Sequence, residues 1–529
     1  LALTSLLALI PATEIALTVL NWDVTHFFPP RLLARMNTAD GIPGNARTFV
    51  VVPTILSSES QVKHLIERLE VHFLANRDSQ IYFALLSDFP DADAEETQND
   101  SALLSTAQSG IEDLNRRHEG NRFHLFHRRR MWNDGEGKWM GWERKRGKLE
   151  EFNQLLRGVH DTTFIVRTGD DEFLKAFRFV ITLDSDTQLP RDVARKLVGA
   201  AIHPLNHPKI DADVNRVTYG YGILQPRVSI SLESASESGF VKIFSGNTGI
   251  DPYTTAVSDV YQDLFGEGSF TGKGLYEIDA FQTVLDKRVP ENTLLSHDLF
   301  ESLFARAALI TEIELLDDYP SSYHTYAKRQ HRWTRGDWQI IRWLLPRKTH
   351  VEGKTFTEHL PLIARWKIFD NLRRSLVAPS LFIWLIACCV LFPGSALGWS
   401  LFVLLTIAFP VYLHVTTGLL IHPRGIPWTS HFWSIWGDFR TNTAQVAIAF
   451  VFLPHQAFIM VDAIVRSLFR QFISHKKLLE WVTAADTERS SGQDLGSFFW
   501  FMLPAEILTL IALGLTFQFR PWALPVMAL

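Results

Sequence analysis

The chain has 529 residues, of which 47% are hydrophobic and 21% charged, and it contains 16 tryptophans and 38 phenylalanines. This length exceeds one ordinary domain, and the balance fits a charged soluble domain fused to apolar membrane segments better than either alone. The formal net charge of −5 argues against a nucleic-acid partner. The chain begins with leucine inside an apolar stretch, so we expect it to belong to a larger polypeptide.

The first part of the chain predicts a membrane helix followed by an α/β domain. Residues 1–30 are assigned to a transmembrane helix and its linker, and residues 45–345 hold nearly all the charge. Runs of β-branched residues predict strands at 48–52 and 81–86, with a helix between them. The second strand ends at Asp88, which could accept hydrogen bonds from a nucleotide base or cap a helix. The glycine-rich loops of dinucleotide-binding folds and NTPases are missing from the sequence.

A strongly basic segment follows, with arginines at 128–130 and the run Arg144-Lys-Arg-Gly-Lys148. Lys148 is predicted to open a helix, where a cation is unfavourable unless an anion lies beside it. A diphosphate near Arg146 and Lys148 would supply that anion. The alternatives are a solvated basic face and a nucleic-acid contact.

The run Phe179-Val-Ile-Thr-Leu-Asp-Ser-Asp186 predicts a buried strand ending in two aspartates. Residues two apart in a strand point to the same side, so Asp184 and Asp186 can converge on one cation. Carboxylates at the carboxyl edge of an α/β sheet suit Mg²⁺ or Mn²⁺, which can hold a diphosphate. The alternative is a solvated turn.

Three later motifs are candidates for sugar or phosphate chemistry. The turn Phe270-Thr-Gly-Lys-Gly274, with Gly272 and Lys273, could bring backbone close to a sugar. Asp298 begins an apolar helix, where it could be a catalytic carboxylate or an ordinary first-turn acid. The segment 330–338 is rich in tryptophan and arginine, which suit sugar stacking and phosphate binding but also a membrane interface.

The C-terminal region, residues 346–529, predicts a membrane domain. Basic residues flank its apolar stretches on the side away from the short uncharged hairpin 393–396, so the hairpin is expected outside and the flanks in the cytoplasm. Residues 441–480 are predicted to lie on the cytoplasmic face as an amphipathic segment, and the alternative is a fifth span at 441–463. With the N-terminal helix, the predicted spans are about 1–20, 376–392, 397–420 and 498–518.

Together these motifs resemble those of processive, membrane-embedded family 2 glycosyltransferases, and they are most similar to cyclic β-1,2-glucan synthases of glycosyltransferase family 84. The resemblance is carried by runs such as RTFVVVPT (47–54), FVITLDSDTQLP (179–190) and RQHRWTRGDWQ (329–339). Two departures from cellulose-synthase-like patterns point away from cellulose or chitin synthesis. Gln330-His-Arg332-Trp333 is one residue shorter than Gln-x-x-Arg-Trp, and Ser296-His-Asp298 replaces Thr-Glu-Asp.

The resemblance implies an α/β GT-A-type nucleotide-sugar-binding domain joined to α-helical transmembrane and interfacial segments. It implies inverting transfer of glucose from UDP-glucose to a growing β-1,2-glucan, with Mg²⁺ or Mn²⁺ at Asp184 and Asp186 and Asp298 as the base. It also implies a multi-pass protein of the bacterial inner membrane with a cytoplasmic catalytic domain. The residues predicted to bind the donor are Asp88, Arg146, Lys148, Asp184, Gln330 and Arg332, and those predicted to bind the acceptor are Gly272, Lys273, Trp333 and Trp338.

Other functions share parts of this pattern. Another processive polysaccharide synthase or a polyprenyl-phosphate glycosyltransferase would have the same donor site and a different product. A non-catalytic membrane glucan sensor would tolerate loss of the base, and the intact acidic residues at 184, 186 and 298 argue against it.

Overall fold

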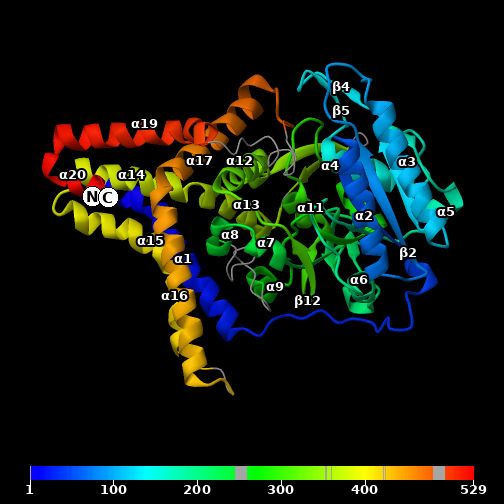
Figure 1. Cartoon of the computed structure of the whole chain (residues 1–529), viewed down its shortest axis with the longest axis horizontal. Coiled ribbons are helices and arrows are strands. Elements are labelled where there is room, and N and C mark those ends of the chain that lie inside the picture. Colours follow the sequence, from blue (N-terminus) through cyan, green and yellow to red (C-terminus); the bar gives the residue numbers. More distant parts are fainter. Residues whose placement is uncertain are drawn as a thin grey trace.

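The computed structural model describes residues 2–528 except 245–258, 352–353, 359, 421, 423–424 and 481–494. An α/β core lies at one end of the molecule, and a group of long helices lies at the other (Figure 1). The mixed α/β architecture predicted from the sequence is therefore confirmed.

The core is built on an eight-stranded sheet in the order β12-β10-β11-β7-β1-β2-β3-β6. Strands β7, β1, β2 and β3 run parallel, whereas β6 and β11 are antiparallel to their neighbours in this group. The predicted strands at 48–52 and 81–86 are confirmed as parts of β1 and β2. The predicted strand that begins at Phe179 is confirmed as β7, but it ends at Thr182, so Asp184 and Asp186 lie in the turn that follows it. The strand bounds are β1 Thr48–Ile55, β2 Ile81–Asp88, β3 Phe123–Arg128, β6 Phe164–Val166, β7 Phe179–Thr182, β10 Ile223–Ile230, β11 Gly274–Glu277 and β12 Ala307–Asp317.

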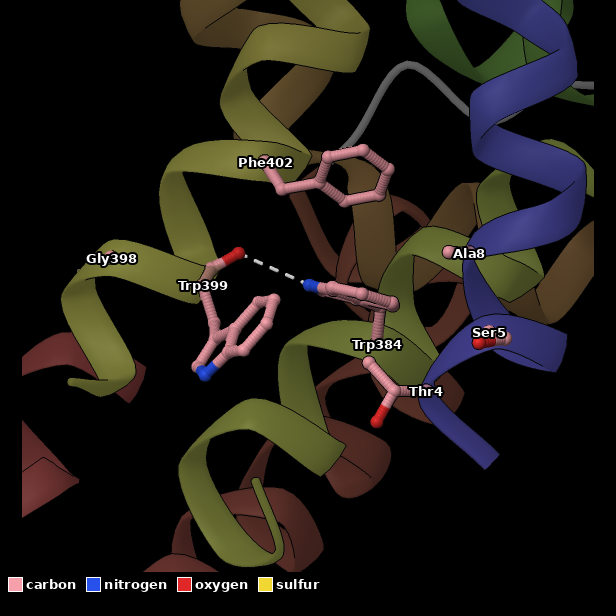
Figure 2. A pocket seen from close by; sticks show the side chains of 7 residues that line it. All are labelled: Thr4, Ser5, Ala8, Trp384, Gly398, Trp399 and Phe402. Atoms are coloured by element: carbon pink, nitrogen blue, oxygen red, sulfur yellow. Dashed lines mark hydrogen bonds between the residues drawn. The ribbon is translucent and has the colours of Figure 1, made fainter. Parts of the chain in front are cut away.

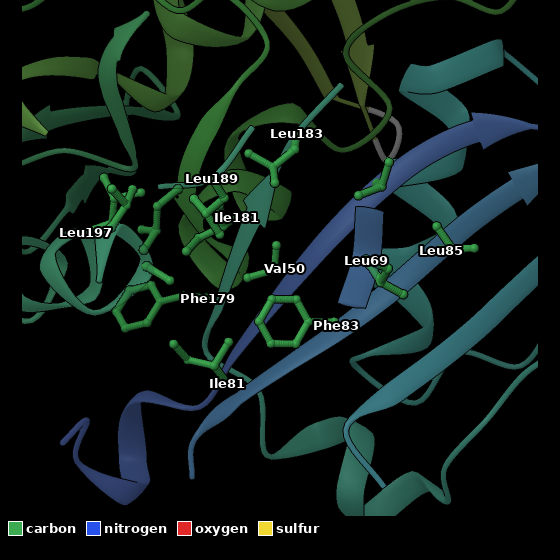
Figure 3. Close-up of a cluster of buried hydrophobic side chains, with 14 of the residues drawn as sticks. Val50, Leu69, Ile81, Phe83, Leu85, Phe179, Ile181, Leu183, Leu189 and Leu197 are labelled. Atoms are coloured by element: carbon green, nitrogen blue, oxygen red, sulfur yellow. The ribbon is translucent and has the colours of Figure 1, made fainter. Parts of the chain in front are cut away.

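Helices cover both faces of the sheet because its central strands are apolar on both sides, as a buried parallel sheet requires. Side chains from one face of β1, β2 and β7 pack with α2 (Glu59–Ala75), α3 (Asp100–Arg117) and α6 (Val193–Ala201). Figure 3 shows part of this cluster, including Val50, Phe83 and Ile181. The other face packs against α4 (Arg144–Leu155), α10 (Ile278–Leu285), α11 (Asp298–Ala305) and α13 (Leu362–Ser375).

The strand order places a topological switch beside β1. From β1 the chain adds β2 and β3 on one side and later β7 on the other side. Open α/β sheets bind ligands outside the carboxyl ends of strands at such a point. Asp88 ends β2, and Asp184 follows β7 by two residues. Both aspartates therefore lie at the edge where a ligand site is expected.

The prediction that Lys148 opens a helix is wrong. Helix α4 begins four residues earlier, at Arg144, after Glu143 in a left-handed conformation. Lys148 lies in the second turn and is buried, so the positive end of the helix dipole gives no reason to expect an anion at this side chain.

Smaller elements complete the core. Three short hairpins, β4–β5, β8–β9 and β13–β14, and several short helices accompany the main sheet, and a longer helix, α12, carries the tryptophan- and arginine-rich motif. Their bounds are β4 Met131–Asn133, β5 Lys138–Met140, α5 Asp171–Lys175, β8 Lys209–Asp211, β9 Arg216–Tyr219, α7 Leu232–Ser236, α8 Gly239–Phe244, α9 Val260–Phe265, α12 Tyr323–Gln339, β13 Arg347–Val351 and β14 Lys354–Glu358.

Helices occupy every region predicted to cross the membrane, but α14, in the region predicted at 376–392, has only 14 residues and is long enough only together with α13. Three described helices are by themselves long and apolar enough to do so, at Leu7–Phe27, Ala396–Leu413 and Gly496–Phe519. Two bent pairs, α13 with α14 and α16 with the helix that follows it, would bring the number to five if each pair were one span. The helix bounds are α1 Ala2–Phe27, α14 Val377–Val390, α15 Ala396–Leu420, α16 Trp428–Val451, α17 Leu453–Phe469, α19 Leu495–Phe519 and α20 Leu524–Met527.

Residues 441–480 do not form one continuous element. They contain the end of α16, a bend of 60° and then α17, which continues into a π-helix at Arg470–Ser474. Helix α17 packs along α12, where Asp462 Oδ2 lies 2.7 Å from His331 Nε2 and Met460 Sδ accepts a hydrogen bond from Thr334. The segment is therefore attached to the core, whereas its position relative to a membrane stays a prediction.

A partly buried ion pair joins α1 to α13. Glu14, a charged residue within the apolar helix α1, lies 2.8 Å from Arg373 Nη1, and Arg373 also donates to Asp370. An isolated carboxylate among apolar helices would be costly, so this partner accounts for an acidic residue in the middle of α1.

An aromatic pocket of about 420 Å³ lies between α1, α14 and α15. Figure 2 shows Trp384, Trp399 and Phe402 on one side and Thr4 and Ser5 on the other. The Trp384 indole donates to the backbone oxygen of Trp399 at 3.1 Å. This hydrogen bond helps to fix the hairpin between α14 and α15.

Candidate active site

The Asp184 carboxylate lies at the centre of the site. Its Oδ1 is 2.6 Å from the ammonium of Lys145, and its Oδ2 is 3.3 Å from that of Lys273. Partial burial favours the neutral acid, but the two lysines outweigh it and hold the pKa of Asp184 well below its usual range. Asp184 is therefore an anion with a cation on each oxygen.

The two lysines are held differently. The ammonium of Lys273 also donates to the buried Asp317 at the end of β12, and the other oxygen of Asp317 accepts from Thr187 at 2.7 Å. Burial opposes the charge on Lys273, but the neighbouring carboxylates raise its pKa above the usual range. Among the described residues, Lys145 has as hydrogen-bond partners Asp184 and the backbone oxygen of Gly272, the latter at 3.1 Å, and its side chain is 25% exposed. Lys273 is thus anchored, whereas Lys145 is held at the site's open side.

Asp186 is a carboxylate that could serve as a metal ligand. It makes no hydrogen bond and no ion pair with any residue that the structure describes. Burial raises the pKa of Asp186, and the negative charges of Asp317 and Asp184 act in the same direction, whereas Lys273 and Arg329 act to lower it. Asp184 and Asp186 are nearby carboxylates, and carboxylate oxygens are ligands that suit Mg²⁺ or Mn²⁺.

The glycine-containing turn before β11 packs against the carboxylate of Asp298, the first residue of α11. Gly272 has a φ of +84°, and a Cβ built on it would lie 2.6 Å from Asp298 Oδ1. Only glycine allows so close an approach of this backbone to the carboxylate. Asp298 Oδ1 is buried and accepts no hydrogen bond from the described residues, although its side chain as a whole is 30% exposed. Oδ1 is therefore enclosed beside the Gly272 backbone and His297, and the exposed remainder of the carboxylate is the part that a substrate can reach.

Behind Asp298 lies a buried histidine–glutamate pair. His297 Nδ1 is 2.8 Å from Glu301 Oε1 and 3.5 Å from Asp298 Oδ1. Burial opposes protonation of His297, but Glu301 and Asp298 outweigh it and raise the pKa of the imidazole. Ligand atoms of all three residues lie within 4.8 Å of one another, as in a metal centre, but the His297 nitrogen is already engaged by Glu301.

Asp88 lies within a buried ionic network. Arg128 binds both of its oxygens, at 2.8 and 2.9 Å, and Lys148 lies 3.0 Å from Oδ2. Burial opposes ionisation, but these cations hold the pKa of Asp88 at about 2. Burial likewise lowers the pKa of Lys148 to about 8, against the attraction of Asp88. Because both oxygens of Asp88 are occupied, a contact with uridine stays a prediction that requires an exchange of partners.

The basic run contributes a different side chain from those predicted. Arg146 pairs with Glu143 and Glu150, and Lys148 donates to the backbone oxygen of Thr54 in addition to Asp88. Neither pairs with Asp184, which Lys145 contacts instead. Lys145 belongs to the same basic run, but nothing in the run indicates which of its cations reaches Asp184. Asp317 gave no signal, because an acidic pair after a strand, here Asp317-Asp318, is most simply a solvated turn.

Helix α12 brings part of its motif to the site. Burial and Arg329 lower the pKa of Arg332 to about 10, while Asp184 and Asp186 act to raise it, so its guanidinium lies within their electrostatic reach. The guanidinium carbon of Arg329 lies over the Trp333 ring, 4.5 Å from the centroid of that ring. Gln330 bonds to Tyr326 within the helix. Trp338 instead donates to Ser375 of α13 at 2.9 Å and packs with the core.

Fold and site thus define an α/β protein with an anion-rich, lysine-bearing site at the carboxyl edge of its sheet, joined to apolar helices. No protein-family model matches the chain. A solved structure of the galactosyltransferase LgtC, in complex with donor and acceptor sugar analogs, is similar with a TM-score of 0.20 and 11% identity, covering 49% of this chain and 72% of that one.

A curated protein gives a much stronger match. The chain is 45% identical over 518 residues to the cyclic beta-(1,2)-glucan synthase NdvB of Rhizobium meliloti (strain 1021). The match covers 96% of this chain and 18% of the length of that synthase. The resemblance to cyclic β-1,2-glucan synthases predicted from the motifs is therefore confirmed, for a segment that is a small part of the relative.

Proposed function

We propose that this chain is a membrane-embedded inverting glucosyltransferase that adds glucose from UDP-glucose to the 2-hydroxyl of a growing β-1,2-glucan. The observation that carries the proposal is the convergence of Asp184, Lys145, Gly272 and Asp298 at one edge of the sheet. The identity of 45% to a segment of a cyclic β-1,2-glucan synthase supports the choice of donor and product.

The proposed reaction needs a base, a leaving-group site and no covalent intermediate. The acceptor hydroxyl oxygen attacks C1 of the donor glucose, the bond from C1 to the diphosphate oxygen breaks, and UDP leaves with the electron pair. The hydroxyl proton passes to the Asp298 carboxylate, whose side chain is 30% exposed. His297 and Glu301 hold Asp298 from behind, and the left-handed turn at Gly272 packs against its buried oxygen.

Residues of this chain fit both the metal and the diphosphate. Asp186, with Asp184, would hold Mg²⁺ or Mn²⁺, which when bound supplies charge neutralisation to the leaving diphosphate. Lys273 is anchored beside the same carboxylates, and Arg332 lies within their field. Ammonium and guanidinium groups so placed would bind diphosphate oxygens. Contacts of Asp88, Arg146, Lys148 and Gln330 with the donor, and of Trp333 and Trp338 with the acceptor, stay predictions.

The proposal also covers the architecture. The α/β core would be a GT-A-type catalytic domain at residues 45–345 on the cytoplasmic side of a bacterial inner membrane. Residues 1–30 and 346–529 would be the membrane-associated parts, with spans at about 1–20, 376–392, 397–420 and 498–518 and an interfacial segment at 441–480. The apolar helices support the membrane association. Cyclisation of the glucan would depend on parts of a longer polypeptide, since the relative is much longer than this chain.

Product analysis tests the proposal. Purified protein in detergent is incubated with radiolabelled UDP-glucose and Mg²⁺ or Mn²⁺, and products are separated by size and analysed for linkage. We expect glucose polymers joined through 2-linked residues. Polymers of another linkage would make the protein a different polysaccharide synthase, and transfer only to a polyprenyl phosphate would place it in a third class. Absence of any transfer would contradict the proposal.

A further inference from the structure

The two cations on Asp184 are not equivalent. The ammonium of Lys273 is tied to Asp317, whose other oxygen is tied to Thr187, and all three side chains are buried. Moving Lys273 would leave Asp317 as a buried uncompensated anion, which is costly. Lys145 has no comparable anchor, because its other bond is to the backbone oxygen of Gly272.

Lys145 therefore holds Asp184 in the way that a metal would. Its ammonium lies 2.6 Å from Asp184 Oδ1, while Asp186, two residues away, has no cation partner among the described residues. A divalent ion bound by both aspartates needs an oxygen of Asp184, and an ammonium at this distance repels it. The lysine stem is flexible and its ammonium is a compact point charge, so it can swing aside without disturbing the fold.

We propose that Lys145 is a stand-in cation that neutralises Asp184 in the donor-free site and is displaced when the metal and the diphosphate arrive together. This inference rests on the proposed function, since it assumes a divalent ion at Asp184 and Asp186. Lys145 is a positioning residue in this scheme. The incoming diphosphate offers its ammonium a new anionic partner, and Gly272 and Asp298 remain within its reach.

The displacement couples metal binding to donor binding. Without a nucleotide, the metal must compete with Lys145 for Asp184, so its affinity is reduced. With UDP present, the ammonium transfers to the diphosphate, and the metal binds more tightly. By reciprocity, the metal raises the affinity for the nucleotide by the same factor. The site would thus bind free divalent cations weakly and would bind the metal and the nucleotide more tightly together than separately.

The test measures Mn²⁺ binding directly, by electron paramagnetic resonance of free Mn²⁺ in the presence of the detergent-solubilised protein, with and without UDP. Lys145→Met removes the competing charge, so we expect Mn²⁺ alone to bind about tenfold more tightly than to the wild type. UDP should strengthen Mn²⁺ binding to the wild type more than to the variant. Lys145→Gln should act like Lys145→Met, while Lys145→Arg should stay close to the wild type.

Controls separate this inference from the proposed function. Lys196→Met removes an exposed lysine of α6 that has no ion pair among the described residues, and it should leave Mn²⁺ binding unchanged. Asp186→Asn should abolish Mn²⁺ binding in every background. If the wild type binds Mn²⁺ and Lys145→Met and Lys145→Gln bind it equally or more weakly, the stand-in role is wrong and the metal site stands. If the wild type binds no Mn²⁺ even with UDP, both the metal site and the stand-in role are wrong.

Discussion

Replacing Gly272 with alanine should strain the turn before β11 and displace the Asp298 carboxylate, by amounts that follow from the geometry at Gly272. The backbone there has a φ of +84°, which costs an L-residue about 1 kcal/mol relative to glycine. The added methyl would lie 2.6 Å from Asp298 Oδ1 and 2.8 Å from its Cγ. Since carbon contacts relax near about 3.5 Å, the Asp298 carboxylate must retreat by roughly 0.5–1 Å.

A displacement of this size should be visible as lost turnover. Misplacing a reacting group by about 1 Å can cost about 10²-fold in rate, so we expect Gly272→Ala to lower glucosyl transfer by about 10- to 100-fold. UDP-glucose affinity should change little, because the Lys273 and Asp184 side chains keep their partners. The assay is initial-rate transfer from radiolabelled UDP-glucose, with nucleotide binding measured separately by calorimetry.

Gly137→Ala is the matched control. Gly137 lies between β4 and β5 with a φ of +67°, and no atom lies within 4 Å of a Cβ built there. It should show a similar loss of stability, about 1 kcal/mol, with full transfer activity. The reasoning is refuted if Gly272→Ala retains more than half of the wild-type rate, or if both variants lose activity equally.

Three further predictions concern the acceptor, acid stability and topology. Trp333→Ala should reduce chain elongation more than hydrolysis of UDP-glucose, because water needs no stacking surface; equal loss of both would make Trp333 a structural residue. Burial lowers the pKa of His124 to about 4, so the native state resists a proton that the unfolded chain accepts below its usual 6.5. The free energy of unfolding should fall as the pH drops through this window, by about 2 kcal/mol at pH 5 for this histidine. In calorimetric melting, the His124→Phe variant should lose less stability than the wild type between pH 7 and pH 5, and an equal loss in both proteins would contradict this prediction. Cysteine introduced at Ser395 should be labelled from outside the cell and at Ser474 only after permeabilisation, whereas outside labelling at Ser474 would support a further span.

The framework of the site was predictable because its signals are local. Apolar β-branched runs predicted β1, β2 and β7. Strand β7 ends at Thr182, however, so Asp184 and Asp186 lie in the turn after it, where the period-two geometry of a strand does not apply. Asp298 was predicted at the start of its helix, where α11 does begin. In each of these cases the residues that carry the signal are neighbours in the chain.

The cations of the site were not predictable, because their roles depend on contacts between distant segments. Lys145 and Asp317 are far from Asp184 in sequence, and charged residues usually lie on a solvated surface. Arg146 and Lys148 have the right charge for a diphosphate, but local acids and the buried Asp88 engage them. Trp338 has the composition of a sugar platform, yet it packs against α13, which the sequence places well beyond the motif.

Asp298→Asn is the measurement that tests the proposed mechanism most directly. Asparagine keeps the size of the side chain but cannot accept the acceptor proton, and Asp298 accepts no hydrogen bond from the described residues that the change would break. We expect the variant to melt like the wild type and to bind UDP-glucose with near wild-type affinity. Its glucosyl transfer should fall by about 10²–10⁴-fold, the range typical of a lost general base. A variant that still polymerises at more than about a tenth of the wild-type rate would assign the base elsewhere and contradict the proposed mechanism.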